Sequence, residues 1–121
     1  MSYTMEWRRN WKTMKQQVLN MLGLARRAGS FVGGHDAAFE SIAKGKAALC
    51  FLTTDASERL KKEFRETVQY EGRAVPLLEP DITMREIERA TGQRCAVFTV
   101  TDAGFASKLT ELLSKEDKEE W

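Results

Sequence analysis

The sequence reads Leu22-Gly-Leu-Ala-Arg-Arg-Ala-Gly29, then Phe31-Val-Gly-Gly-His-Asp36, then Lys44-Gly-Lys-Ala-Ala-Leu-Cys-Phe-Leu-Thr-Thr-Asp55. These segments predict a helix that ends at Gly29, a short strand, a glycine turn, a second helix and a buried strand. Arginines followed by glycine are a usual helix ending. The six apolar residues 47–52 have the length of a fully buried strand. The alternation of helices and strands indicates an α/β domain.

The remaining sequence continues this alternation. Apolar residues four apart predict a helix after Asp55, and residues 74–78 predict a strand that Pro76 confines to a sheet edge. A short helix over 83–91, a buried strand over 95–100 and a closing helix follow. We therefore expect one domain over residues 1–121, with helices on both faces of a sheet of about four strands. Residues 48–52 and 97–100 are expected at its centre, residues 1–9 as an irregular arm and 115–121 as a loosely ordered tail.

Composition excludes several classes of protein. No apolar run has the length of a membrane span, and residues 1–10 lack the apolar core of a signal peptide. Cys50 and Cys95 stand alone in predicted strands, which favours reduced core thiols over a disulfide framework. A single histidine makes a zinc site unfavourable. We expect a cytoplasmic protein without a cofactor or bound metal.

The net charge of +1 conceals an asymmetry along the chain. Residues 1–46 hold eight lysines and arginines against three acidic residues, whereas residues 47–121 hold eleven against fifteen. The basic part includes the glycine turn at 33–34, so the pattern allows nucleic-acid binding. A solvated charged surface explains the same pattern.

The expected helix caps differ in kind. Asp55-Ala-Ser-Glu58 and Thr83-Met-Arg-Glu86 both fit the capping-box pattern, and Asp102 can cap the last helix. The second helix instead follows Gly33-Gly34, so its first N–H groups have no strong side-chain acceptor. Such a helix start can bind an anion or the acceptor edge of a base. The alternative is an ordinary glycine cap with hydrated amides.

An enzymatic interpretation rests on Asp55 and Asp102, which follow two buried strands in the repeated pattern Thr-Asp-Ala. Ligands of open α/β sheets bind at the carboxyl ends of strands. Capping explains both residues as well, and the sequence holds no dinucleotide or phosphate-loop motif and no evident nucleophile–base pair. We therefore expect no catalysis.

The ordered set LGLARRAG, the V-G-G-x-D loop, K-G-K-A-x-L, TTDAS and VTDAGFASKL resembles the kink-turn-binding ribosomal protein family of the L-seven-Ae and L-thirty-e-like type, and most closely its small bacterial YlxQ-type members. The resemblance covers residues 18–113. It implies a three-layer α-β-α sandwich with a mixed sheet. It also implies a ribosome-associated protein that binds structured RNA of the kink-turn type.

In that family, the loop after the first strand and the start of the second helix hold a kinked RNA internal loop. The residues carried over to this chain, together with basic residues that can bind phosphates, are Gly33, Gly34, His35, Asp36, Glu40, Lys44, Lys46, Asp55, Arg26, Arg27, Gln93 and Arg94.

Two positions depart from the family pattern. Ala37 replaces the usual glutamate after Asp36, and Glu40 replaces a lysine, which places a negative charge where RNA phosphates are expected. Lys44, Lys46, Arg26 and Arg27 can compensate. The departures also leave open a second interpretation, a protein-interaction module that kept the fold and lost RNA binding. The sequence names neither the RNA nor the oligomeric state.

Overall fold

The described part of the chain alternates between helices and strands as predicted. The computed structural model describes residues 3–70 and 75–118, and the side chains of residues 12–69 and 75–114. The helices are α1 (Tyr3–Arg27), α2 (His35–Ala43), α3 (Glu58–Tyr70), α4 (Met84–Thr91) and α5 (Ala103–Lys118). The strands are β1 (Phe31–Gly33), β2 (Leu49–Leu52), β3 (Leu77–Leu78) and β4 (Val97–Val100).

The strands form one mixed sheet in the order β1-β4-β2-β3. β4 runs antiparallel to β1 and to β2, whereas β2 and β3 are parallel. The two strands predicted to be central, β2 and β4, are central. β3 lies at an edge, as expected from Pro76, which has no N–H to donate to a further strand.

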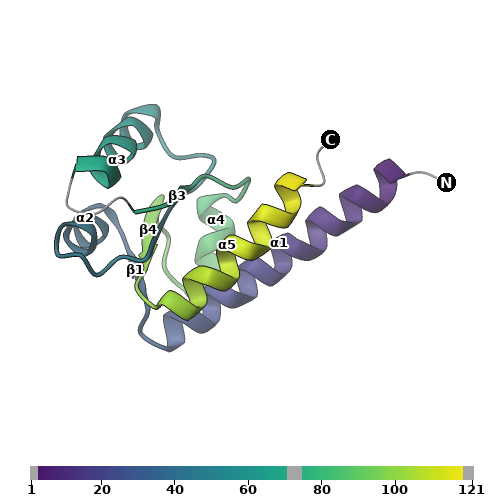
Figure 1. The fold of residues 1–121 in the computed structure, drawn as a ribbon, viewed down its shortest axis with the longest axis horizontal. Coiled ribbons are helices and arrows are strands. Elements are labelled where there is room, and N and C mark those ends of the chain that lie inside the picture. The colour runs from purple at the N-terminus through teal and green to yellow at the C-terminus, as the bar shows by residue number, and fades with distance from the viewer. Residues whose placement is uncertain (1–2, 71–74, 119–121) are drawn as a thin grey trace.

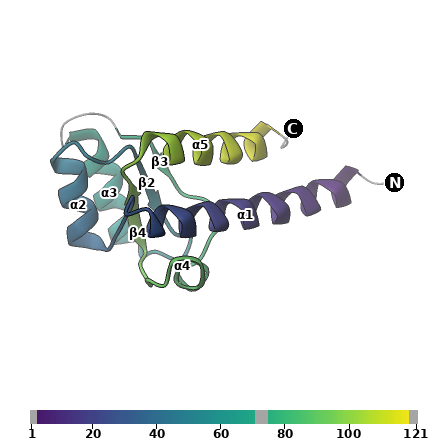
Figure 2. The ribbon, with the colours of Figure 1, turned by 90° about the horizontal axis from the view of Figure 1, so that it is seen from below.

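Helices cover both faces of the sheet, which confirms the predicted three-layer sandwich (Figures 1 and 2). Side chains alternate along each strand, so Leu49 and Phe51 pack on one face with α1, α4 and α5. Cys50 and Leu52 pack on the other face with α2 and α3. On the first face Phe98 stacks against Phe31 and Phe51, with ring centroids 4.9 Å apart in each pair.

Two glycines of α1 and its C-terminal turn determine where α1 ends and how closely it packs against α4. At Gly29, φ is +80°, and the N–H of Ser30 donates to the carbonyl of Ala25 at 2.8 Å, which closes α1 as predicted. Gly23 lies inside α1 because a Cβ there would meet the carbonyl oxygen of Ala90 at 2.8 Å. The absence of a side chain at Gly23 therefore lets α1 contact the backbone of α4.

Several predicted boundaries are wrong. α1 begins at Tyr3, so the expected irregular arm is helical from that residue onward, and no glycine or proline interrupts residues 3–22. α5 continues to Lys118, so residues 115–118 of the expected tail carry helical backbone, since residues 111–118 are mostly good helix formers. β2 and β4 each begin two residues later than expected, and β3 contains only Leu77 and Leu78.

Both cysteines are free and buried, as predicted. Burial raises the pKa of the Cys50 thiol to about 12 and that of Cys95 to about 11, so both thiols stay protonated near neutral pH. Among the described residues, no helix combines the length and the apolar character needed to cross a membrane.

Candidate nucleic-acid interface

Three loops meet at one end of the sheet. The last residue of β1, Gly33, lies opposite Phe98 of β4, and the last residue of β2, Leu52, lies opposite Val97. This register brings the turn between β1 and α2, the loop after β2 and the loop before β4 to the same edge. We call this region, formed by residues 33–37, 53–55 and 93–96, the sheet edge. The name refers to this end of the strands and not to the outer strand β3.

The start of α2 at the sheet edge has no side-chain cap, as predicted. Gly34 is the N-cap residue, with φ 105° and ψ 158°, a conformation that favours glycine. Its N–H donates to the carbonyl of Val97, and the first helix-closing bond joins Ala38 N–H to Gly34 O at 2.9 Å. The N–H groups of residues 35–37 therefore have no acceptor among the described residues and are available to an anion or a base-edge oxygen.

Gln93 fixes the position of this turn. Its side-chain Nε2 donates to the carbonyl of Gly33 at 3.0 Å, and its Oε1 accepts from Nη1 of Arg26 at 2.9 Å. A Cβ at Gly33 would lie 2.9 Å from Cys95 Sγ and 3.0 Å from Gln93 Cδ, so any larger residue there would displace these two side chains. The loop before β4 thus holds the glycine turn and connects it to the end of α1. The sequence placed Gln93 at the interface but gave no sign of this positioning contact.

His35 joins the start of α2 to the middle of α3. Its Nδ1 lies 2.9 Å from Asp36 Oδ1, its Nε2 lies 2.8 Å from Glu63 Oε2, and its ring is perpendicular to that of Phe64. The hydrogen bond to Asp36 and then that to Glu63 raise the pKa of His35, because both favour the imidazolium. Only the doubly protonated ring can donate to both carboxylates. Sequence analysis did not identify Glu63, which lies 28 residues away.

Glu40 pairs with Lys44, the C-cap residue of α2. Its Oε2 lies 2.9 Å from Nζ of Lys44, and both side chains are more than half exposed. The hydrogen bond and charge of Lys44 lower the pKa of Glu40, with a smaller contribution from Lys46. Lys44, which we expected to attract RNA phosphates, is therefore engaged in neutralising Glu40. Both lysines follow the C-terminal end of α2, roughly 13 Å from the glycine turn at 1.5 Å per residue.

Asp55 does not cap its own helix, which corrects the capping-box prediction for residues 55–58. α3 begins at Glu58, so its N-cap position is Ser57, whose Oγ accepts from the N–H of Leu60 at 3.1 Å. The carboxylate of Asp55 accepts instead from the N–H of Met84 at 3.1 Å, at the start of α4. Asp55 therefore accepts a hydrogen bond from the start of α4 instead of α3.

The other predicted caps are confirmed. Thr83 and Glu86 form a reciprocal capping box on α4, and Asp102 accepts from the N–H groups of Gly104 and Phe105 at the start of α5. Side chains therefore cap the starts of α3, α4 and α5. Among these helices and α2, only α2 begins without a side-chain acceptor.

The structure brings eight of the twelve predicted site residues together and separates the other four. Arg26 joins the sheet edge through Gln93, whereas Arg27 lies on a different surface between α1 and α4. Arg94 lies next to Gln93 and pairs with Glu88 at 3.4 Å. The members of the predicted site at the sheet edge are Gly33, Gly34, His35, Asp36, Asp55, Gln93, Arg94 and, through its hydrogen bond, Arg26. Among the described residues no group of three or more metal-ligating side chains forms.

Solved structures define the class of this domain. A protein of unknown function from Bacillus halodurans matches with a TM-score of 0.73 and 28% identity, over 80% of this chain and 96% of that chain. The 15.5 kD RNA-binding protein of Giardia lamblia matches with a TM-score of 0.67 and 16% identity, over 88% and 90% of the two chains. The fold is that of the L-thirty-e-like α-β-α domains, as the resemblance implied.

Relatives narrow the class to a family. The RNA-binding protein YlxQ of Enterococcus faecium is 35% identical over 99 residues, which cover 82% of this chain and 93% of that protein. The RNA-binding protein YlxQ of Bacillus subtilis is 36% identical over 94 residues, which cover 77% and 91%. The chain therefore belongs to the YlxQ family. No family model matches the chain.

Proposed function

We propose that the protein binds structured RNA of the kink-turn type at the sheet edge, without catalysis. The observation that carries the proposal is the uncapped start of α2, held in place by the bond from Gln93 to Gly33. The names of the relatives from Enterococcus faecium and Bacillus subtilis support RNA as the partner. Of the cations in the basic first third of the chain, Arg26 lies at the sheet edge, where its charge attracts RNA phosphates.

Each group at the sheet edge has a defined chemical capacity. The free N–H groups of residues 35–37 donate to phosphate or base oxygens. The fully exposed carboxylate of Asp36 accepts from base amino groups, which splayed or non-Watson–Crick bases present. Arg26 retains donors beyond the one used on Gln93 and can bind a phosphate.

Positioning distinguishes this edge from an ordinary polar loop. The glycine turn has its carbonyl and its N–H both bound, to Gln93 and to Val97, so the free amides of α2 point in fixed directions. Groups held in place before binding lose less entropy when the ligand arrives. We propose that the RNA is ribosomal RNA or another kink-turn RNA, and that the protein acts in the cytoplasm in association with the ribosome.

The second candidate is a protein-interaction module on the same fold. Ala37 removes a side-chain contact to a base, and Glu40 places a negative charge on α2, which favour loss of RNA binding. The pairing of Glu40 with Lys44 weakens this argument, because the lysine at the end of α2 offsets the negative charge.

A gel-shift comparison at low salt separates the two candidates. The probes are an RNA with a kink-turn internal loop and a fully paired duplex of the same length. We expect tighter binding of the kink-turn RNA, with affinity that falls steeply as salt rises. Equal binding of both probes, or of neither, would favour the interaction module. RNA that copurifies with the native protein would identify the partner.

A further inference from the structure

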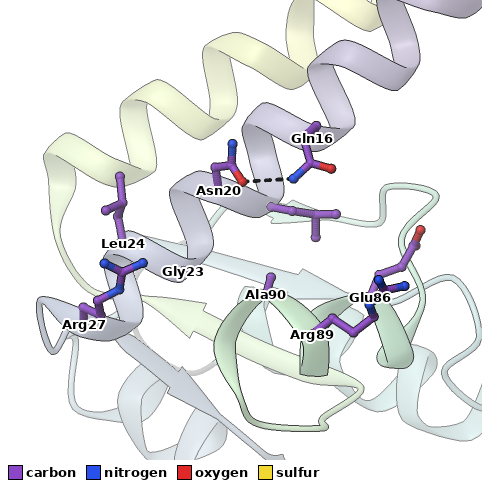
Figure 3. A pocket seen from close by; sticks show the side chains of 9 residues that line it. Gln16, Asn20, Gly23, Leu24, Arg27, Glu86, Arg89 and Ala90 are labelled. Carbon is purple, nitrogen blue, oxygen red and sulfur yellow. Dashed lines mark hydrogen bonds between the residues drawn. The ribbon is translucent and has the colours of Figure 1, made fainter.

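A groove with a volume of about 560 Å³ lies between α1 and α4, outside the sheet edge (Figure 3). Arg27 contributes to it from α1 and Arg89 from α4, and Figure 3 shows the contact between Gly23 and Ala90 lying between these two arginines. Gly23 thus sets the distance between the helices that carry the two charges.

The charge of the groove is positive. Neither Arg27 nor Arg89 has an ion-pair partner among the described side chains, and both are exposed. The acidic residue that lines the groove, Glu86, is neutralised by Lys15 at 2.7 Å and also bonds the start of its own helix. Both arginines lie in the last turn of a helix, where a cation is favourable by itself. The additional feature that indicates a ligand is that both arginines line the same groove.

The other lining groups suit a polar, extended ligand. The side-chain amides of Gln16 and Asn20 bond each other at 2.9 Å and keep further donors free toward the groove. Leu24 is 48% exposed beside them. A pocket for a small molecule is mostly apolar with few polar groups, whereas this groove offers cations and amides along two helix surfaces.

One end of the groove lies near the sheet edge. Arg27 follows Arg26, whose guanidinium bonds Gln93, and Gln93 follows α4 after a single glycine, Gly92. The C-terminal ends of both groove helices therefore meet at the hydrogen bond between Arg26 and Gln93.

We infer that the α1/α4 groove is a second RNA contact, in which Arg27 and Arg89 bind backbone phosphates of the duplex that continues from the RNA held at the sheet edge. This inference rests on the proposed function and extends it to a second surface. The guanidinium forks match phosphate oxygens, and such contacts position an RNA without reading its sequence.

The test uses Arg27→Gln, Arg89→Gln and the double variant of the full chain. Two kink-turn RNAs serve as probes, one whose duplex ends at the internal loop and one whose duplex continues by about one further helical turn. The control variant is Lys108→Gln, which removes one positive charge from α5 on the other side of α1 (Figure 2). Thermal melts followed by circular dichroism verify that all variants fold.

With the long RNA, we expect the log–log salt slope of binding to fall by about one for each single variant and about two for the double variant. The short RNA and the control should change little. Ethylation of the flanking phosphates should interfere with binding by the parent and not by the double variant.

Other outcomes overturn the inference. If the double variant binds the long RNA like the parent, the groove is not an RNA contact, although RNA binding at the sheet edge stands. If the parent binds neither RNA, the proposed function and this inference both fail. If the arginine variants lose binding to a polyglutamate peptide but not to RNA, the groove accepts an acidic protein instead.

Discussion

Two substitutions of Glu40 test whether its negative charge and its pairing with Lys44 reduce RNA affinity. Glu40→Gln removes the charge and releases Lys44, which lies 2.9 Å away in the parent protein. Glu40→Lys also adds a second cation on the same face of α2. Both positions are exposed, so the substitutions leave the core unchanged. If RNA lies along this face, each step should add one phosphate contact.

The size of the effect follows from counterion release. Each neutralised phosphate steepens the log–log dependence of affinity on salt by about 0.9, so we expect about 0.9 for Glu40→Gln and about 1.8 for Glu40→Lys. As salt rises from about 50 to about 200 mM, the ratio of variant to parent affinity should therefore fall about 3.5-fold for Glu40→Gln and about 12-fold for Glu40→Lys. At the lower salt concentration both variants should bind more tightly than the parent.

The assay is fluorescence anisotropy with a labelled kink-turn RNA over this range of salt. A matched control is Glu111→Lys on α5, because Glu111 also pairs with a nearby lysine, Lys108, and α5 covers the opposite face of the sheet from α2. The control reverses the same charge at a distant site. Equal gains from Glu40→Lys and Glu111→Lys would refute a local effect, and no gain from either Glu40 variant would show that this face of α2 is not near the RNA.

The structure makes three further predictions. Because the pKa of His35 is raised, its ion pairs stabilise the fold below about pH 6.5 and lose this effect as pH rises through the raised pKa. His35→Gln should therefore lower the melting temperature more at about pH 5.5 than at about pH 8.5. An equal effect at both pH values would contradict this prediction. Gln93→Leu leaves the part-buried carbonyl of Gly33 without its donor and should lower the free energy of unfolding by about 1–2 kcal/mol in urea titrations, together with RNA affinity; unchanged values would exclude a positioning role. Gly23→Ala gains about 1 kcal/mol of helix propensity but forces a Cβ against the carbonyl of Ala90. We expect the free energy of unfolding in urea titrations to fall by up to about 2 kcal/mol. A rise in this free energy would show that α1 and α4 separate without cost.

The fold was predictable because its determinants are local. Gly29 after two arginines ends α1, Thr83 and Glu86 cap α4 three residues apart, and Pro76 marks the edge strand. Each of these signals lies within a few residues of the feature it specifies. The arrangement of layers then follows from the alternation of side chains along β2 and β4.

The candidate site was less predictable because its contacts join distant residues. Gln93 bonds a carbonyl 60 residues earlier, and Asp55 caps a helix whose first residue lies 29 positions later. No periodicity or capping pattern links such positions, and a helix start at Ser57 in place of Asp55 falls within the usual uncertainty of helix boundaries. The pairing of Glu40 with Lys44 was accessible from their spacing of four, and it changes the expected charge of α2.

Backbone amide shifts measured by NMR during titration with RNA test the central claim most directly. We predict that a kink-turn RNA shifts the signals of residues 35–37 and the side-chain amide of Gln93, because these groups form the open, fixed edge of the sheet. A fully paired duplex of equal length should shift them much less. Unchanged signals at these positions, with shifts confined to other surfaces of the protein, would contradict the assignment of the sheet edge as the RNA-binding site.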